Sequence, residues 1–132
     1  MIRDHPFVGR GIGTFMDYFH DYMPQFPTEY AHNCFLQIWA ETGMFALLAF
    51  LGFCIILLGT GMKTFLRTNN YAVLGLVCGL FGFLVHSFFD TQLYSLPLSM
   101  LFWSAAGVLW AICRSEQAQL RPVPGLKHNR GK

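Results

Sequence analysis

The chain has 132 residues, of which 54% are hydrophobic and 12% charged, and its formal net charge is +2. Soluble domains carry roughly one quarter charged residues, so this composition favours a membrane protein over a soluble globular one. Most of the positive charge lies in the C-terminal tail, which is typical of an anchor against anionic lipid rather than a nucleic-acid-binding surface. The four cysteines show no metal-ligand spacing. We therefore expect no nucleic-acid partner, no metal and no other cofactor.

Residues 1–43 form the more polar N-terminal segment. The sequence PFVGRGIG at positions 6–13 has the glycine spacing of a phosphate loop, but it lacks the preceding strand and the helix-opening pattern that such a loop needs. The glycines instead predict a backbone that takes positive φ and approaches a neighbour closely, with Arg10 projecting from it. The aromatic and acidic stretch 16–23 predicts a short interfacial helix.

A second helix is expected to begin shortly after Thr28, its predicted N-cap, and to continue into an apolar run. On this helix Asn33, Gln37 and Glu41 recur every four residues and make a polar stripe, with His32 at its edge. The stripe is either the wall of a functional site at membrane level or the water-facing side of an ordinary amphipathic helix. Periodicity leaves both interpretations open.

Three apolar runs are long enough to cross a hydrocarbon core of about 30 Å at about 1.5 Å per helical residue. They cover residues 44–62, 71–89 and 93–113. The predicted fold class is all-α integral membrane, with three transmembrane helices preceded by an outward-facing loop that contains the interfacial helix. A soluble helical bundle is disfavoured, because its helices rarely carry nineteen residues in a row without a charge, as 44–62 does.

Charge placement predicts how these spans are oriented. Seven of the nine basic residues lie between the first two runs or after the third, and six of the seven acidic residues lie on the opposite side. The positive-inside rule makes the basic side cytoplasmic. Residues 1–43 are then periplasmic, and residues 114–132 form a basic cytoplasmic tail that we expect to be disordered. No signal peptide precedes the outward segment, so we expect a C-terminal piece of a larger multi-pass protein.

The second predicted span carries a narrow face of small and ionisable residues. These are Gly75, Gly79, Gly82, His86 and Asp90. Small residues permit another helix to pack closely, and the histidine and the aspartate would lie one turn apart near the outer end. We interpret this pair first as a packing feature and second as a relay, because an ionisable residue within a membrane is also a functional candidate.

Three motifs together resemble the C-terminal part of the O-antigen ligase-like family, which includes O-antigen ligases, O-antigen polymerases and protein O-oligosaccharyltransferases of bacterial inner membranes. They are RDHPFVGxGxGTF at positions 3–15, HNxxLQxxxExG at 32–43, and HSxxDT at 86–91 followed by a final apolar helix. The middle motif is the most specific, and the resemblance covers most of the chain. The tail beyond Arg114 carries no family signal.

The resemblance implies a glycosyltransferase that moves a glycan from a polyprenyl-pyrophosphate carrier to a lipid, polysaccharide or protein acceptor on the periplasmic face. It implies that His32 is the catalytic residue and that arginines bind the pyrophosphate, with Arg3 and Arg10 as candidates. Imidazole accepts the proton of a sugar hydroxyl, and arginine stabilises the leaving pyrophosphate by bidentate hydrogen bonds. The further substrate-binding candidates are Asn33, Gln37 and Glu41. The family's usual arginine upstream of this segment would precede the chain, which is therefore expected to be inactive by itself.

Two other classes of protein stay open. The first is a multi-pass transporter in which His86 and Asp90 relay protons or ions, since some relatives of the family have been assigned to transport. The second is a non-catalytic membrane assembly subunit, which would be favoured if the short chain is a complete product. The sequence specifies neither the acceptor nor the sugar.

Overall fold

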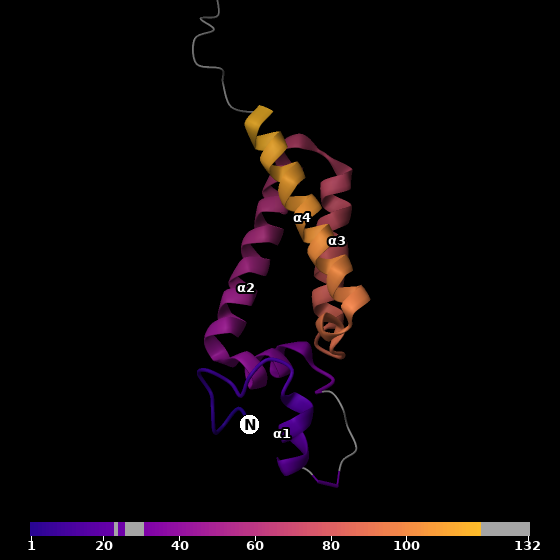
Figure 1. The fold of residues 1–132 in the computed structure, drawn as a ribbon. Coiled ribbons are helices and arrows are strands. Elements are labelled where there is room, and N and C mark those ends of the chain that lie inside the picture. The colour runs from indigo at the N-terminus through magenta and orange to yellow at the C-terminus, as the bar shows by residue number, and fades with distance from the viewer. Residues whose placement is uncertain (23, 26–30, 120–132) are drawn as a thin grey trace, which may run out of the picture.

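The computed structural model describes residues 1–22, 24–25 and 31–119, and the regular elements in these ranges are helical. They are α1 (Phe15–Tyr22), α2 (Cys34–Thr68), α3 (Tyr71–His86), the 3₁₀ helix η1 (Gln92–Tyr94) and α4 (Leu96–Gln119). Figure 1 shows α2, α3 and α4 as a bundle, with α1 and the N-terminal loop gathered at one end. The predicted all-helical class and the short helix ahead of the bundle are confirmed.

Two of the helices, α2 and α4, are long and apolar enough to cross a membrane, and only 17% and 22% of their most apolar windows are buried. The core helix of a soluble protein is mostly buried, so these exposed apolar faces fit contact with lipid or with further helices. The third helix, α3, is apolar but has only 16 residues. At about 1.5 Å per residue it is about 24 Å long, which is less than a hydrocarbon core of about 30 Å. A bundle with three spans therefore stays a prediction.

The second predicted span, 71–89, ends earlier than expected. The helix ends at His86, and Ser87 caps it by donating its backbone N–H to the carbonyl of Phe83 at 3.0 Å. The residues that follow form turns. Asp90 therefore does not continue the helical face of His86, and the predicted spacing of one turn is wrong.

The third predicted span, 93–113, is displaced toward the C-terminus. The first residues of that range belong to η1, and α4 begins at Leu96 and continues to Gln119. Residues 114–119 were predicted to begin a disordered tail but are helical, because most of them are good helix formers. Glu116 also accepts a hydrogen bond from Asn70 Nδ2 at 3.1 Å, which ties α4 to the start of α3. The remainder of the predicted tail, 120–132, lies outside the described residues.

The apolar core lies where α2, α3 and α4 meet. Its buried side chains are Cys54, Leu57, Val73, Val77, Leu80, Phe102, Ala106, Leu109 and Cys113. Gly61 of α2 makes the close approach of the helices possible, because a Cβ atom there would lie 2.5 Å from Val77 Cγ2 and 3.2 Å from Leu109 Cδ1.

The glycine face of α3 is not used in this packing. A Cβ atom added to Gly75, Gly79 or Gly82 would meet no atom within 4 Å in the part of the chain that the structure describes. The opposite side of α3, with Val73 and Val77, packs into the core instead. The prediction of close packing through these glycines is therefore wrong within this bundle, because the larger apolar side chains bury more surface.

The first predicted span, 44–62, belongs to a longer helix that contains a break. α2 begins at Cys34, where Asn33 is the N-cap, whereas the predicted cap Thr28 lies outside the described residues. At Gly43 the backbone leaves the helical region, with φ 84° and ψ 173°. The break separates a short arm, residues 34–42, from the long apolar part that starts at Met44, where the first span was predicted to begin (Figure 1).

Candidate functional site

The glycine loop, residues 6–13, packs against the break in α2. A break in a helix leaves backbone donors and acceptors without their usual partners, and buried groups of this kind need others. Three hydrogen bonds from or to the glycine loop supply them, namely Arg10 N to Ala40 O at 3.1 Å, Gly11 N to Glu41 O at 2.8 Å and Met44 N to Pro6 O at 3.0 Å. The glycine loop therefore replaces helical hydrogen bonds that the break removes.

Two glycines make this contact possible. A Cβ atom on Gly9 would lie 2.2 Å from the carbonyl oxygen of Glu41, and one on Gly43 would lie 2.1 Å from the carbonyl oxygen of Phe7. Both glycines also have positive φ, at 69° and 84°. The predicted close approach of the loop backbone to a neighbour is therefore confirmed, and the neighbour is the break in α2.

Glu41 holds the glycine loop, α1 and η1 together from inside the protein. Its side chain is 1% exposed. Its carboxylate accepts hydrogen bonds from Gly13 N at 2.9 Å, from Phe15 N at 3.2 Å and from Tyr94 Oη at 3.0 Å. The bond to Phe15 also places a negative charge at the start of α1, where the helix dipole favours it. The pKa of Tyr94 is raised well above its ordinary range, mainly because the phenol is buried and also because the Glu41 carboxylate lies beside it. The phenol therefore stays a neutral donor.

The polar stripe of the arm faces protein rather than water. Gln37 is 2% exposed, and its Nε2 atom donates to Glu41 Oε1 at 3.4 Å. The interpretation of the stripe as the water-facing side of an amphipathic helix is therefore wrong for these two residues. Their role in substrate binding stays a prediction, and the hydrogen bonds that they make here are within the chain.

His32 and Asn33 lie at the start of the arm, next to the end of α3. His32 is exposed and has a left-handed backbone, with φ 47°. Asn33 Nδ2 donates to Phe88 O at 3.1 Å, and Cys34 N donates to Ser87 O at 2.9 Å. The motif at 32–43 and the motif at 86–91 are therefore in direct contact, although Asn33 and Phe88 are 55 positions apart.

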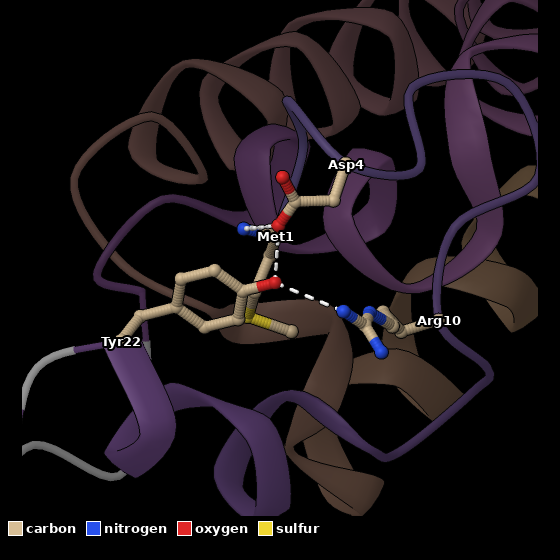
Figure 2. A network of polar contacts seen from close by, with 4 residues as sticks. All are labelled: Met1, Asp4, Arg10 and Tyr22. Carbon is tan, nitrogen blue, oxygen red and sulfur yellow. Dashed lines mark hydrogen bonds and ion pairs between the residues drawn. The ribbon is translucent and has the colours of Figure 1, made fainter.

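Arg10 belongs to a network of polar contacts on the N-terminal segment, which Figure 2 shows. Its Nη2 atom donates to Tyr22 Oη at 3.0 Å, and its guanidinium lies 4.9 Å from the centre of the Tyr18 ring. Tyr22 Oη in turn donates to Asp4 Oδ2, which also lies 3.5 Å from the Met1 amine. The hydrogen bond from Tyr22 lowers the pKa of Asp4. The network ties Arg10 to the far end of α1.

An apolar groove of about 460 Å³ lies between α1, the start of the arm and the N-terminal residues. It is lined by Met1, Ile2, Arg3, Asp4, Phe15, Phe19, Tyr22, Ala31, Leu36 and Ala40. Arg3 is exposed and adds a cation to this lining, and Ala31 is the direct neighbour of His32. The groove is therefore mostly apolar and carries two residues of opposite charge, Arg3 and Asp4.

His86 and Asp90 are both exposed, and across the described ranges no hydrogen bond joins their side chains. Asp90 Oδ1 instead accepts from the backbone N–H of Thr91 at 2.7 Å. Their assignment as a structural or relay pair stays a prediction.

Sequence reasoning did not find the two tyrosines that complete these contacts. Tyr94 lies 53 positions from Glu41, and Tyr22 lies 18 positions from Asp4. No local pattern marks either tyrosine as a partner of a distant carboxylate, because the fold alone brings the groups together.

Comparison with known proteins finds a family match at this end of the molecule. Residues 1–51 match the family model described as O-antigen ligase. The match confirms the predicted family resemblance for the motifs at 3–15 and 32–43. Together with the two long apolar helices, the match supports a likeness to a family of membrane proteins that resemble glycosyltransferases. The motif at 86–91 lies beyond the matched residues, and no curated protein or solved structure matches the chain.

Proposed function

We propose that this chain supplies the catalytic histidine of a glycosyltransferase in a bacterial inner membrane. The enzyme is multi-pass and moves a glycan from a polyprenyl-pyrophosphate carrier to a lipid, polysaccharide or protein acceptor on the periplasmic side. The observation that carries the proposal is the match of residues 1–51 to the O-antigen ligase family, because this range contains both His32 and the glycine loop. The contacts between the loop and the arm support it further.

His32 is the general base in this proposal. It is exposed, so an acceptor hydroxyl can approach its imidazole. The imidazole takes the hydroxyl proton while the oxygen bonds to the anomeric carbon. The bond between that carbon and the pyrophosphate oxygen breaks, its electron pair leaves with the pyrophosphate, and the anomeric centre is inverted.

The surroundings of the two arginines favour different roles. Arg10 is held by Tyr22 and lies over Tyr18, so it stabilises the N-terminal segment. Arg3 is exposed and lines the apolar groove, so it is the proposed contact for pyrophosphate. A guanidinium suits this role, because it donates two parallel hydrogen bonds to a phosphate.

The first prediction tests the general base. In the intact protein, His32→Ala should lower glycan transfer by about 10²- to 10⁴-fold, which is the usual contribution of general-base assistance. Membrane insertion and abundance should stay unchanged, because the exposed His32 side chain adds little to the packed bundle. Transfer is measured as glycan ladders on the acceptor, and abundance by immunoblot of membranes.

His20→Ala is the matched control, because His20 is also an exposed histidine of the N-terminal segment. It should keep wild-type transfer. Near-normal transfer by correctly inserted His32→Ala would contradict the proposed function. An equal loss of transfer in His32→Ala and His20→Ala would also contradict it, because the loss would then not be specific to His32.

The transport alternative receives less support from the geometry. A relay needs proton donors and acceptors within hydrogen-bond reach, and no such bond joins His86 and Asp90 in the described part of the chain.

A further inference from the structure

Asn33 makes two different hydrogen bonds with the two ends of its amide group. Its Oδ1 atom accepts from Leu36 N at 3.0 Å, which is the N-cap bond of α2. Its Nδ2 atom donates to Phe88 O at 3.1 Å, which links the arm to the segment after α3. The oxygen and the nitrogen of the amide therefore each form a hydrogen bond with a backbone group. These bonds hold the chain at this point and do not involve the imidazole of His32.

A second contact at the same junction is buried. Cys34 N donates to Ser87 O at 2.9 Å, and both residues are 0% exposed. The rings of Phe35 and Phe88 also lie close together, with centroids 4.5 Å apart. Leaving a buried backbone donor or acceptor without a partner is costly, because the group has lost its hydrogen bonds to water. The start of α2 is therefore fixed to the end of α3.

His32 directly precedes this junction in a backbone conformation that is uncommon for residues with a Cβ atom. Its φ of 47° is left-handed, a region in which the Cβ atom lies too close to the following carbonyl oxygen. Such a conformation persists when the surrounding structure imposes it. The junction provides that constraint, because the residues that follow His32 are held by Ser87 and Phe88.

We propose that Asn33 is a positioning residue for His32, and that it acts by joining the start of α2 to the carbonyl of Phe88. This inference rests on the proposed function, because it concerns where the catalytic imidazole is held. It also assigns a role to the motif at 86–91, which becomes the support for the histidine rather than a proton relay. The hydrogen bond to Phe88 then matters for the reaction separately from the helix cap.

Two variants separate these roles. Asn33→Asp and Asn33→Ser both keep a side-chain oxygen that caps a helix well, but neither retains the amide donor that reaches Phe88 O. Both should insert and accumulate like the wild type. The kcat for transfer should fall by about 10- to 100-fold, because small misplacements of catalytic groups have effects of this size. The KM for a polyprenyl-pyrophosphate-linked glycan, measured with lipid A core as the acceptor probe, should stay within about twofold of the wild-type value.

Asn70→Ser is the matched control. Asn70 also caps a helix, through Ala72 N at 3.0 Å, and also donates across the bundle, to Glu116 Oε1 at 3.1 Å, but it lies at the start of α3 rather than near its end. This variant should keep the wild-type kcat per folded molecule. Amide hydrogen exchange, measured by mass spectrometry, reports on the junction itself and does not depend on catalytic activity. Peptides over residues 32–36 and 86–91 should exchange faster in both Asn33 variants and not in Asn70→Ser.

The outcomes distinguish this inference from the proposed function. If His32→Ala abolishes transfer but both Asn33 variants keep the wild-type kcat, Asn33 is a helix cap only and the positioning role is overturned. Reduced kcat with unchanged exchange at the junction would overturn it too. If His32→Ala retains transfer, the proposed function itself fails, whatever the exchange measurements show.

Discussion

Gly9 and Gly13 have the same kind of backbone in different surroundings. Their φ values are 69° and 76°, so a side chain at either position would be strained. A Cβ atom on Gly9 would overlap the backbone of Glu41 and Thr42, whereas one on Gly13 would meet nothing within 4 Å. Comparing substitutions at these two glycines therefore separates the effect of backbone strain from the effect of a steric clash with the arm.

Gly9→Ala should destabilise the protein much more than Gly13→Ala. The alanine at position 13 adds only the left-handed strain, about 1–2 kcal/mol. At position 9 the methyl group must also displace the arm, which breaks the backbone hydrogen bonds from the glycine loop to Ala40 and Glu41. Thermal unfolding in detergent, together with membrane abundance, checks the difference. Equal destabilisation would show that the loop does not pack against the break as described.

The environment of the Glu41 side chain could not be predicted from its residue type. Its spacing from Asn33 and Gln37 predicts the stripe, but a carboxylate on a stripe can face water, substrate or protein. Here it is buried and accepts two backbone N–H groups and the Tyr94 hydroxyl. Such charge-assisted bonds offset the desolvation of a buried carboxylate.

Among the elements, α2 depends on glycines at two places for opposite reasons. Gly43 breaks the helix and admits the glycine loop, whereas Gly61 lies within regular helix and admits the side chains of α3 and α4. Gly59 lies on the same helix but is exposed, and a Cβ atom there would meet nothing within 4 Å in the described ranges. These differences make α2 suitable for a test of the packing.

Gly61→Val should reduce the yield of folded protein, and Gly59→Val should not. Filling a tightly packed contact costs about 1–3 kcal/mol, and here the nearest atom is Val77 Cγ2 at 2.5 Å from the new Cβ. Adding Val77→Ala to a Gly61→Ala variant should restore part of the yield, because it removes the atoms that clash. Size-exclusion chromatography in detergent measures the folded fraction. If both valine variants behaved alike, the packing of α2 against α3 would be wrong.

For the whole molecule, the uneven distribution of charge predicts that the glycine loop is periplasmic and the C-terminus cytoplasmic. Cys34 is 0% exposed, so this native cysteine is a poor target for a labelling reagent. Ile12 is 83% exposed on the glycine loop and provides a better position. The orientation can therefore be tested with an introduced cysteine.

Ile12→Cys should react with an impermeant maleimide added from the periplasmic side, and a reporter fused after Lys132 should behave as cytoplasmic. The unsubstituted protein is the control for reaction at Cys34 and at Cys78, which is exposed on α3. Labelling of Ile12→Cys only after the membrane is permeabilised would reverse the orientation and remove the proposed site from the periplasm.

The sequence by itself determined the features that depend on local composition. Long runs without charge require helices with apolar surfaces, the glycines at 9 and 13 permit positive φ, and the motif at 32–43 carried the family resemblance that the match confirmed. Helix ends were less predictable. Asn33 caps α2, whereas the predicted cap was Thr28. The substrate-binding role predicted for Asn33 stays a prediction.

Only the tertiary structure decided which of these groups meet. The glycine loop lies on the break in α2, Glu41 bonds to Tyr94, and Asn33 bonds to Phe88. Each contact joins residues that are distant in the sequence, and each depends on how helices pack and where they end. Periodicity places a residue on a face of its own helix, but it does not say which neighbour covers that face. The glycine face of α3 demonstrates this, since α2 and α4 pack against the other side.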